Sequence, residues 1–432
     1  MSRATPRHAV RHNTKAGAAT RLLGLSIAVG YLILYRSTAP DPSWLALILI
    51  MAILFGRTLV SFLHVPTKRR SLGKLQVTLV MPFYDEGDET LRGTFASIIT
   101  QVRLPDALYI INDGSRVGGA EVERWLPAFR SRIKTVKYIE FDRNHGKRAA
   151  LAEAIRMTDS DIIVTTDSDT TMHPHAIHEI VRPFGNPRVA AATGRVTVRN
   201  RNKNLLTRLQ DVIYVAAFFN SRASLSTIGS VLVCSGAIGA YRRDVISPYL
   251  EDFLSNQWMF GEDRHLTSYA LRHGRVVLQE SAIARTNAPE HIGHYLRQQT
   301  RWQRGFLQNS IWILKHFPLG NKVFWMTFGK VAASLALTVL MPLALAQNLF
   351  GTVLVHGAII YALVSWSHLT RYLEVRGEGT LPTRLLFFLV APLLSLVQML
   401  LLAPVRIYAL LTFGAKGWGS RIRRLAPADA TS

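Results

Sequence analysis

Residues 161–170 read DIIVTTDSDT, an apolar run that ends at two carboxylates one residue apart. The run Ile162–Thr165 is short and rich in β-branched residues, which predicts a buried strand with Asp167 and Asp169 just past its end. Two such carboxylates can share a divalent cation that bridges two phosphates, because Mg²⁺ and Mn²⁺ prefer oxygen ligands and accept some of them from a substrate. A lone triplet of this kind is also common as a solvated loop or a helix cap.

The surrounding sequence repeats a rhythm of strand, helix and strand. Strands are predicted at Gln76–Met81, Leu108–Ile111 and Val136–Phe141, with helices at Glu89–Val102, Ala120–Arg130, Arg148–Met157, Lys203–Ser224, Arg264–His273 and His291–Ile313. This alternation predicts an α/β domain with a Rossmann-like, mostly parallel sheet. Ligands bind at the carboxyl edge of such sheets, which is where the acidic residues fall.

Three further motifs lie at predicted strand ends or helix starts. In IINDGS, Asp113 suits a turn whose carboxylate accepts hydrogen bonds from a base or a ribose, and an Asx turn without a ligand is the alternative. MPFYDEG offers Tyr84 and Glu86, an aromatic face and an acceptor, at the same edge. HGKRAAL places Lys147 at a helix start that favours an anion, although a surface helix with ordinary caps has the same residues.

Two motifs in the second half of the domain supply a base and an aromatic platform. Glu262 and Asp263 open a helical run, and a carboxylate there can take a proton from an attacking hydroxyl; stabilisation of the helix N-terminus is the alternative. In RQQTRW, Gln298, Arg301 and Trp302 share one helix face, which suits a phosphate beside a sugar ring. Of the two, Asp263 is the expected base.

Apolar segments flank this domain. Candidate membrane spans are Leu22–Tyr35, Ser43–Val65, Leu385–Val405 and the stretch Val331–Thr370, which has no charged residue and is long enough for two helices of roughly 20 residues. A signal peptide is the alternative for the first span, and the number of C-terminal crossings stays open. Membrane-surface helices would also carry tryptophans, and this setting is expected for Trp312 and Trp325.

The charge and the cysteine content agree with a membrane protein whose catalytic domain faces the cytoplasm. The net charge of +23 collects in the N-terminal tail, after the second span and near the C-terminus, as expected of cytoplasmic flanks, so no nucleic acid is expected as a partner. The single cysteine allows no internal disulfide. The predicted organisation is a basic tail (1–21), two membrane helices (22–66), the catalytic domain (74–304), interfacial helices (305–330), membrane helices (331–413) and a second basic tail (414–432).

Taken in order, these motifs resemble those of the family-two processive glycosyltransferases, in the branch of hyaluronan synthases, chitin synthases and the nodulation chitooligosaccharide synthase. VCSGAIGAYRRDVI (233–246), YLRQQTRW (295–302) and GWGSR (417–421) extend the resemblance over nearly the whole chain. It implies a GT-A-like domain embedded between transmembrane helices. Three positions depart from the family pattern: Asn112 replaces an aspartate, Ala237 a proline and Ser420 a threonine.

The resemblance also implies roles for individual residues. The donor nucleotide would be held by Tyr84, Glu86, Asp113, Lys147 and Asp167, and the metal by Asp169 with Asp167. Asp263, beside Glu262, would take the proton, Arg301 and Gln298 would contact the diphosphate or the acceptor, and Trp302 would hold the terminal sugar. The acceptor site would be lined by Cys234, Ser235 and Gly236, and Trp418 with Arg421 would close over the donor. The cofactor would be Mg²⁺ or Mn²⁺.

The leading hypothesis is therefore a multi-pass plasma-membrane enzyme with a cytoplasmic catalytic domain. It would polymerise UDP-sugars with inversion, hyaluronan synthase-like, and export the growing polysaccharide chain through its own helices in contact with membrane lipids. The alternatives are a chitin or chitooligosaccharide synthase that uses UDP-N-acetylglucosamine alone, and a non-processive lipid glycosyltransferase. A binding protein without activity is disfavoured because Asp113, Asp169, Asp263 and Trp302 are all present.

Overall fold

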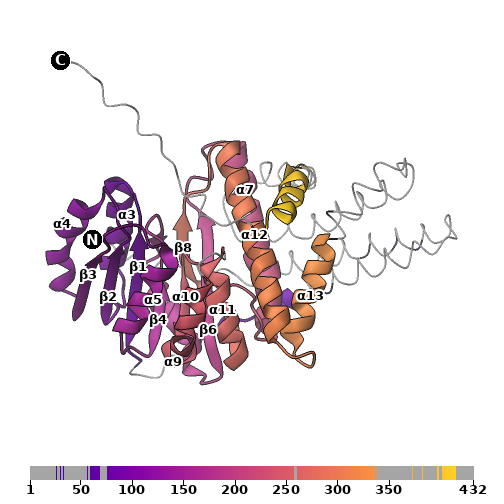
Figure 1. The fold of residues 1–432 in the computed structure, drawn as a ribbon, viewed down its shortest axis with the longest axis horizontal. Helices are drawn as coiled ribbons and strands as arrows, with labels where there is room; N and C mark the ends of the chain where they lie inside the picture. Colours follow the sequence, from indigo (N-terminus) through magenta and orange to yellow (C-terminus); the bar gives the residue numbers. More distant parts are fainter. Residues whose placement is uncertain are drawn as a thin grey trace, which may run out of the picture.

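The computed structural model describes residues 59–68, 75–256, 260–335 and 401–414, with single positions elsewhere. Within these residues, an eight-stranded sheet has the order β3-β2-β1-β4-β7-β6-β8-β5. Helices cover the sheet, and the long helix α12 runs beside its second half (Figure 1). The strands that carry the predicted acidic residues lie in the first half of this order.

The first half of the sheet is parallel and follows the predicted rhythm. It consists of β1 (Val77–Phe83), β2 (Ala107–Asn112), β3 (Thr135–Glu140) and β4 (Ile162–Thr165), connected by α3 (Asp88–Ile99), α4 (Gly119–Arg130) and α5 (Lys147–Met157). Every residue of β1, β2 and β4 is buried, as expected for parallel strands covered on both faces. The predicted strands and crossover helices are confirmed to within a few residues.

The second half makes the sheet mixed, whereas we predicted a mostly parallel one. Its elements are β5 (Thr171–Met172), α6 (Ala176–Val181), β6 (Val189–Val198), α7 (Leu205–Ala216), α8 (Ala223–Thr227), β7 (Gly239–Arg242), α9 (Arg243–Ile246), α10 (Leu250–Ser255), α11 (Glu262–His273) and β8 (Arg275–Thr286). β7 runs antiparallel to β4 and β6, and β5 antiparallel to β8, while β6 and β8 are parallel. The sequence rhythm had shown only the parallel half.

A π-helical turn interrupts the helix that we predicted over Lys203–Ser224. The segment η2 (Ala217–Arg222) lies between α7 and α8 and widens the helix by one residue per turn. The capping box of Asn204 and Thr207 starts α7, because each side chain binds the other's backbone N–H. The π turn changes which residues face the sheet, and its last residue, Arg222, enters the candidate site.

Two long helices follow β8 and bring the C-terminal part of the chain back to the domain. They are α12 (Ile292–His316) and α13 (Lys322–Leu335). Residues 401–411 are also helical and pack beside α12, where Arg304 donates to the Thr412 hydroxyl at 2.8 Å (Figure 1). A segment that precedes the domain docks on β8, since His64 lies 3.5 Å from the buried Glu280.

The predicted membrane spans lie largely on residues that the structure does not describe. Among the helices that it does describe, none combines the length and the apolar composition needed to cross a bilayer. The packed core of the described residues belongs to the sheet and its covering helices.

Candidate active site

The carboxyl ends of β2, β1 and β4 lie side by side, because these parallel strands are neighbours. Asp113 follows β2, Glu86 follows β1 and Asp167 follows β4. The Ser168 hydroxyl donates to the Glu86 carboxylate at 3.1 Å and so joins the ends of β1 and β4. Tyr84 is 39% exposed. The structure therefore brings four sequence-predicted donor residues to one edge of the sheet.

Asp113 fastens the loop that leads into α5. Its carboxylate accepts the backbone N–H groups of His145 at 2.7 Å and of Gly146 at 3.0 Å. Burial raises the pKa of Asp113, and these two hydrogen bonds oppose the rise. Gly146 has a φ of +88°, a conformation that side chains with a Cβ rarely adopt. Asp113 thus helps to set the position of Lys147, the next residue of the chain.

Asn112 has a structural role that explains its departure from the family pattern. Its side-chain amide donates to the Glu140 carboxylate at 3.0 Å, and its side-chain oxygen accepts the Ser115 N–H at 2.7 Å. An ionised aspartate could keep the second bond and not the first, because a carboxylate has no donor. The asparagine is therefore matched to the glutamate at position 140.

We expect Asn112→Asp to lower the free energy of unfolding by about 1–3 kcal/mol, because it places two carboxylates at hydrogen-bond distance. Adding Glu140→Gln restores a donor–acceptor pair and should recover most of the loss, which thermal unfolding of the two single variants and the double variant would measure. Equal stability of Asn112→Asp and the unaltered protein would contradict this role.

Lys147 joins the end of β4 to the start of α11. Its ammonium group lies 2.5 Å from Asp167 and 3.0 Å from Glu262. Burial alone lowers the pKa of Lys147, but the charges of Asp167 and Glu262 outweigh burial and raise it. A Cβ at Gly236 would lie 3.0 Å from the Lys147 ammonium group and 3.3 Å from Asp167, so this position favours glycine. Gly236, predicted to line the acceptor site, thus lies against this ion-pair cluster.

The pKa values of the adjacent carboxyl groups of Glu262 and Asp263 are shifted in opposite directions. Burial opposes ionisation of Glu262, but the nearby Lys147 charge dominates and lowers the pKa of Glu262 to about 2. Burial and the charge of Glu262 raise the pKa of Asp263 to about 6. Such a split is the usual sign of two carboxyl groups with different tasks. Asp263 is the group that can exchange a proton near neutral pH.

Two half-buried arginines near Asp263 were missed from the sequence. Burial lowers the pKa of Arg222, at the end of the π turn, and the Asp263 charge opposes this effect. Burial likewise lowers the pKa of Arg264, the next residue on α11, to about 10. Arg222 could have been suspected, because it is the one charged residue in the otherwise uncharged run AAFFNSRASL. Both arginines favour the ionised form of Asp263.

Helix α12 presents the predicted acceptor residues. Trp302 is 43% exposed, and its ring lies 6.4 Å from that of Tyr214 on α7. Burial and the charge of Asp169 raise the pKa of Tyr214, which connects this aromatic pair with the acidic pair after β4. The side-chain oxygen of Gln298 is buried and accepts no hydrogen bond within the described part of the chain. Arg301, half-buried, lies one residue before Trp302.

The residues before β7 have a more structural setting than we predicted. The Cys234 side chain is fully buried, burial raises the pKa of its thiol to about 12, and its N–H donates to Thr267 at 2.9 Å. The Ser235 N–H donates to the Thr193 hydroxyl at 3.0 Å. Of this trio, the structure brings Gly236 to the charged cluster, while the thiol of Cys234 faces the core.

Asp169 is the residue that best fits a metal. Its carboxylate accepts the Thr286 hydroxyl at 3.4 Å, at the carboxyl end of β8. Within the described residues, no three His, Cys, Asp or Glu side chains group as metal ligands, and Asp167 is already paired with Lys147. Mg²⁺ and Mn²⁺ commonly take one or two carboxylates and fill their shells with phosphate oxygens and water. The residues present fit that mode of binding.

Trp418 and Arg421 lie outside the described residues, but the chain just before them is anchored near the site. The Gln308 side chain on α12 donates to the Phe413 carbonyl at 2.6 Å and accepts the Phe260 N–H at 2.8 Å. Phe260 lies two residues before Glu262. The C-terminal segment and the start of α11 are therefore held by one glutamine.

Trp312 is a correction to the sequence-based prediction. We expected it at a membrane surface, yet it is only 7% exposed and packs on His265 and Tyr269 with ring separations of 5.1 and 5.3 Å. Trp325 on α13 is 55% exposed, as such a position requires. Trp312 is buried because α12 packs on α11, a contact that the sequence pattern did not show.

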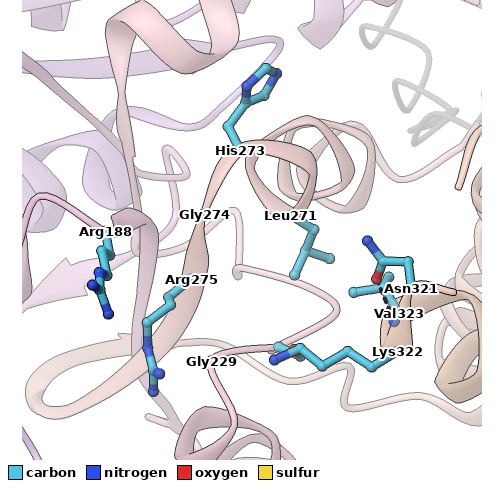
Figure 2. Close-up of a pocket in the computed structure, with 10 residues that line it drawn as sticks. Arg188, Gly229, Leu271, His273, Gly274, Arg275, Asn321, Lys322 and Val323 are labelled. Carbon is cyan, nitrogen blue, oxygen red and sulfur yellow. Dashed lines mark hydrogen bonds between the residues drawn. The ribbon is translucent and has the colours of Figure 1, made fainter. Parts of the chain in front are cut away.

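One cavity of about 320 Å³ lies away from these residues, at the amino ends of β6 and β8 (Figure 2). Arg188, Arg275 and Lys322 line it without any acidic residue. Lys322 donates to the Ile228 carbonyl at 2.6 Å and Arg275 to the Thr227 carbonyl at 3.2 Å, so backbone acceptors hold both side chains. Asp169 lies at the other end of β8.

The mixed sheet, with an acidic pair after its fourth strand and a carboxylate pair at the start of a later helix, defines a glycosyltransferase of the GT-A fold. The family described as glycosyltransferase like family 2 matches residues 75–305, more than half of the chain, and the chain belongs to this family. It is an enzyme that transfers sugars.

The chain is similar over most of its length to curated members of this family. It is 34% identical over 376 residues to the hyaluronan synthase of Streptococcus pyogenes, which covers 84% of this chain and 87% of the relative. It is 32% identical over 354 residues to an N-acetylglucosaminyltransferase of Azorhizobium caulinodans, covering 80% and 87%. A solved mannosyltransferase of Pyrobaculum calidifontis, in complex with GDP-Man and Mn²⁺, has the same fold, with a TM-score of 0.54, 15% identity and coverage of 92% and 99%.

Proposed function

We propose that the chain is a membrane-integrated, hyaluronan synthase-like enzyme that polymerises UDP-sugars with inversion at the anomeric carbon. The observation that carries this proposal is the charged cluster at the carboxyl edge of the sheet, where the Lys147 ammonium group lies 2.5 Å from Asp167 and 3.0 Å from Glu262, next to Asp263. The similarity to the synthase of Streptococcus pyogenes supports the choice of polymer.

The donor would bind along the carboxyl edge of β2, β1 and β4. Tyr84, Glu86 and Asp113 lie there to receive the uridine, while Lys147 and Arg301 carry positive charge for the diphosphate. A divalent cation held by Asp169, with Asp167 beside it, would neutralise the diphosphate and make it a better leaving group. Lys147 keeps Asp167 in place for this task, since the two groups are 2.5 Å apart.

Asp263 would act as the general base. The acceptor hydroxyl attacks the anomeric carbon of an α-linked UDP-sugar, its proton passes to the Asp263 carboxylate, and UDP leaves with the electrons of the broken bond, so the product is β-linked. A base with a pKa of about 6 is ionised at neutral pH and still accepts a proton well. Glu262 remains ionised throughout because Lys147 holds it.

Trp302 and Gln298 would hold the end of the growing polymer. The exposed indole of Trp302 offers a face for a sugar ring, and Gln298 has a buried side-chain oxygen that lacks a donor in the described residues. A platform of this kind is most useful when the product stays bound between additions, which favours polymerisation over a single transfer. Trp418 and Arg421 would close over the donor from the segment anchored by Gln308.

The setting would be the plasma membrane, with the catalytic domain in the cytoplasm. Support comes from the uncharged stretch Val331–Thr370, the apolar segments before residue 66 and the basic residues that flank them. The polymer would leave through these helices, and membrane lipids would surround them. The organisation proposed above, with the catalytic domain at 74–304, follows from the same pattern.

Two donors distinguish the polymers that this site could make. Membranes that contain the enzyme should make long polymer from UDP-N-acetylglucosamine and UDP-glucuronate together, and release little UDP with either one alone. EDTA should stop the release of UDP, and Mg²⁺ or Mn²⁺ should restore it. Polymer from UDP-N-acetylglucosamine alone would instead favour the chitin or chitooligosaccharide alternative. The relative of Azorhizobium caulinodans, which is named an N-acetylglucosaminyltransferase, agrees with that alternative.

A further inference from the structure

Four buried or half-buried side chains behind Asp263 form a continuous chain of hydrogen bonds. The Arg148 guanidinium lies 2.9 Å from Nδ1 of His265, Nε2 of His265 lies 3.0 Å from the Tyr269 hydroxyl, and that hydroxyl lies 2.6 Å from the Asp252 carboxylate. Arg148 is 4% exposed, and His265 and Tyr269 are fully buried. The chain begins at a buried cation and ends at a partly exposed carboxylate.

Each bond of this chain has a fixed direction. Arginine can only donate, so Nδ1 of His265 carries the lone pair and Nε2 carries the proton. That proton is donated to the Tyr269 oxygen, and the Tyr269 O–H is donated to Asp252. Burial and the charge of Arg148 lower the pKa of His265 to about 2, so the imidazole stays neutral. A neutral histidine of one tautomer therefore connects Arg148 to Tyr269.

The chain joins the elements that hold the reacting groups. Arg148 follows Lys147 in the first turn of α5, and His265 lies two residues after Asp263 in the first turn of α11. Asp252 lies within α10, the helix that precedes the connection to α11. Trp312 of α12 packs on both His265 and Tyr269, so the helix that carries Trp302 contacts the same network.

Phe253 completes the surroundings of the buried cation. Its carbonyl accepts a hydrogen bond from Arg148 at 3.2 Å, and its ring lies 4.6 Å from the guanidinium. A buried arginine without such partners would carry a large desolvation cost. Here a neutral imidazole, a backbone carbonyl and an aromatic face surround the guanidinium, and its positive charge acts on Glu262 and Asp263.

We infer that the hydrogen-bonded chain Arg148–His265–Tyr269–Asp252 is a positioning device for the transfer reaction. It holds the first turn of α5, with Lys147, against the first turn of α11, with Glu262 and Asp263, and it fixes a buried positive charge behind the base. These four side chains make no contact with substrate in this scheme. The inference rests on the proposed function, because it assumes that Asp263 is the base.

Several other charged or titratable groups act on Asp263 and must stay unchanged in a test. Outside the chain, they are Lys147 on α5, Arg222 on the π turn, Cys234 and Tyr241 around β7, and Glu262 and Arg264 on α11. Tyr269→Phe alters none of them and removes only one hydroxyl group. It breaks the second and third of the chain's three bonds, those between His265 and Tyr269 and between Tyr269 and Asp252, and leaves Arg148 less firmly held.

Tyr269→Phe in the full-length enzyme is therefore the informative variant. We expect kcat for UDP release to fall roughly tenfold with little change in the KM of the donor, because the base is displaced while the nucleotide site is intact. The acidic limb of the pH profile should move to higher pH, since a loosely held Arg148 favours ionised Asp263 less. Arg148→Met should move the limb further in the same direction.

Tyr109→Phe is the matched control, because Tyr109 is also a buried tyrosine whose hydroxyl donates a single hydrogen bond, to the Met157 carbonyl at 3.2 Å, far along the sheet. If both variants lose similar thermal stability but keep the unaltered kcat and acidic limb, the chain is only structural and the inference is wrong. If the unaltered enzyme has no acidic limb, or Asp263→Asn stays active, the proposed function fails instead.

Discussion

Asp263→Asn should abolish polymer synthesis and leave UDP binding intact. The amide has nearly the shape of the carboxylate but cannot accept the proton of the attacking hydroxyl, and a general base contributes about 10²–10⁴-fold to a rate. We expect initial UDP release in purified membranes to fall by roughly 10³-fold, with a nearly unchanged affinity for UDP. Glu262→Gln should bind less UDP, because it disturbs the Lys147 cluster.

The same change should stabilise the protein above pH 6. Asp263 has a folded-state pKa of about 6, raised from the ordinary aspartate value, so the folded state pays a cost for ionising it that is absent below about pH 4 and complete above pH 6. Asparagine removes this cost, and the thermal midpoint should rise at pH 7.5 but not at pH 4. Asp159→Asn, at a fully exposed side chain, is the control, and it should leave the thermal midpoint unchanged at both pH values.

Lys147→Met has the second largest expected effect, because it leaves two carboxylates without their shared cation. Asp167 and Glu262 lie 2.5 and 3.0 Å from the ammonium group, and because these side chains are half-buried, the loss of their shared cation should cost about 1–3 kcal/mol. Activity should be lost through weaker donor binding. Any residual activity should show its acidic limb above pH 6, since the Lys147 charge lowers the pKa of Asp263.

A second substitution separates stability from activity. Glu262→Gln added to Lys147→Met removes one of the stranded carboxylates and should recover part of the lost stability without recovering the activity. Lys134→Met, at an exposed lysine between α4 and β3, is the matched control and should leave the thermal midpoint and the rate unchanged. Full activity of Lys147→Met would contradict the role given to this cluster.

The first half of the sheet could be predicted because each of its strands has a signal within its own short stretch of sequence. β1, β2 and β4 are buried on both faces, so they read as short apolar runs between helical patterns. β6 and β8 escaped prediction for opposite reasons. β6 contains three alanines and a glycine, which have low strand propensity, and β8 carries Gln279 and Glu280 at buried positions, where Gln279 accepts the Thr67 N–H and Glu280 lies 3.5 Å from His64.

In the candidate site, too, some residues could be predicted from the sequence and others could not. Asp113, Asp167 and Asp263 could be found from the sequence, because acidic residues past strand ends or at helix starts form a recognisable pattern. Arg222 gave only a weak signal, as a single charge in an uncharged run, because its approach to Asp263 depends on a π turn. Trp312 was misplaced, because the burial of α12 against α11 is a tertiary contact without a local signal.

The pH dependence of UDP release tests the central claim most directly. With both donors saturating, the unaltered enzyme should lose activity as the pH falls through about 6, with the slope of a single proton, while the residual activity of Asp263→Asn should lack this limb. An Asp263→Asn enzyme that releases UDP at the unaltered rate, or that keeps the same acidic limb, would show that another group takes the proton.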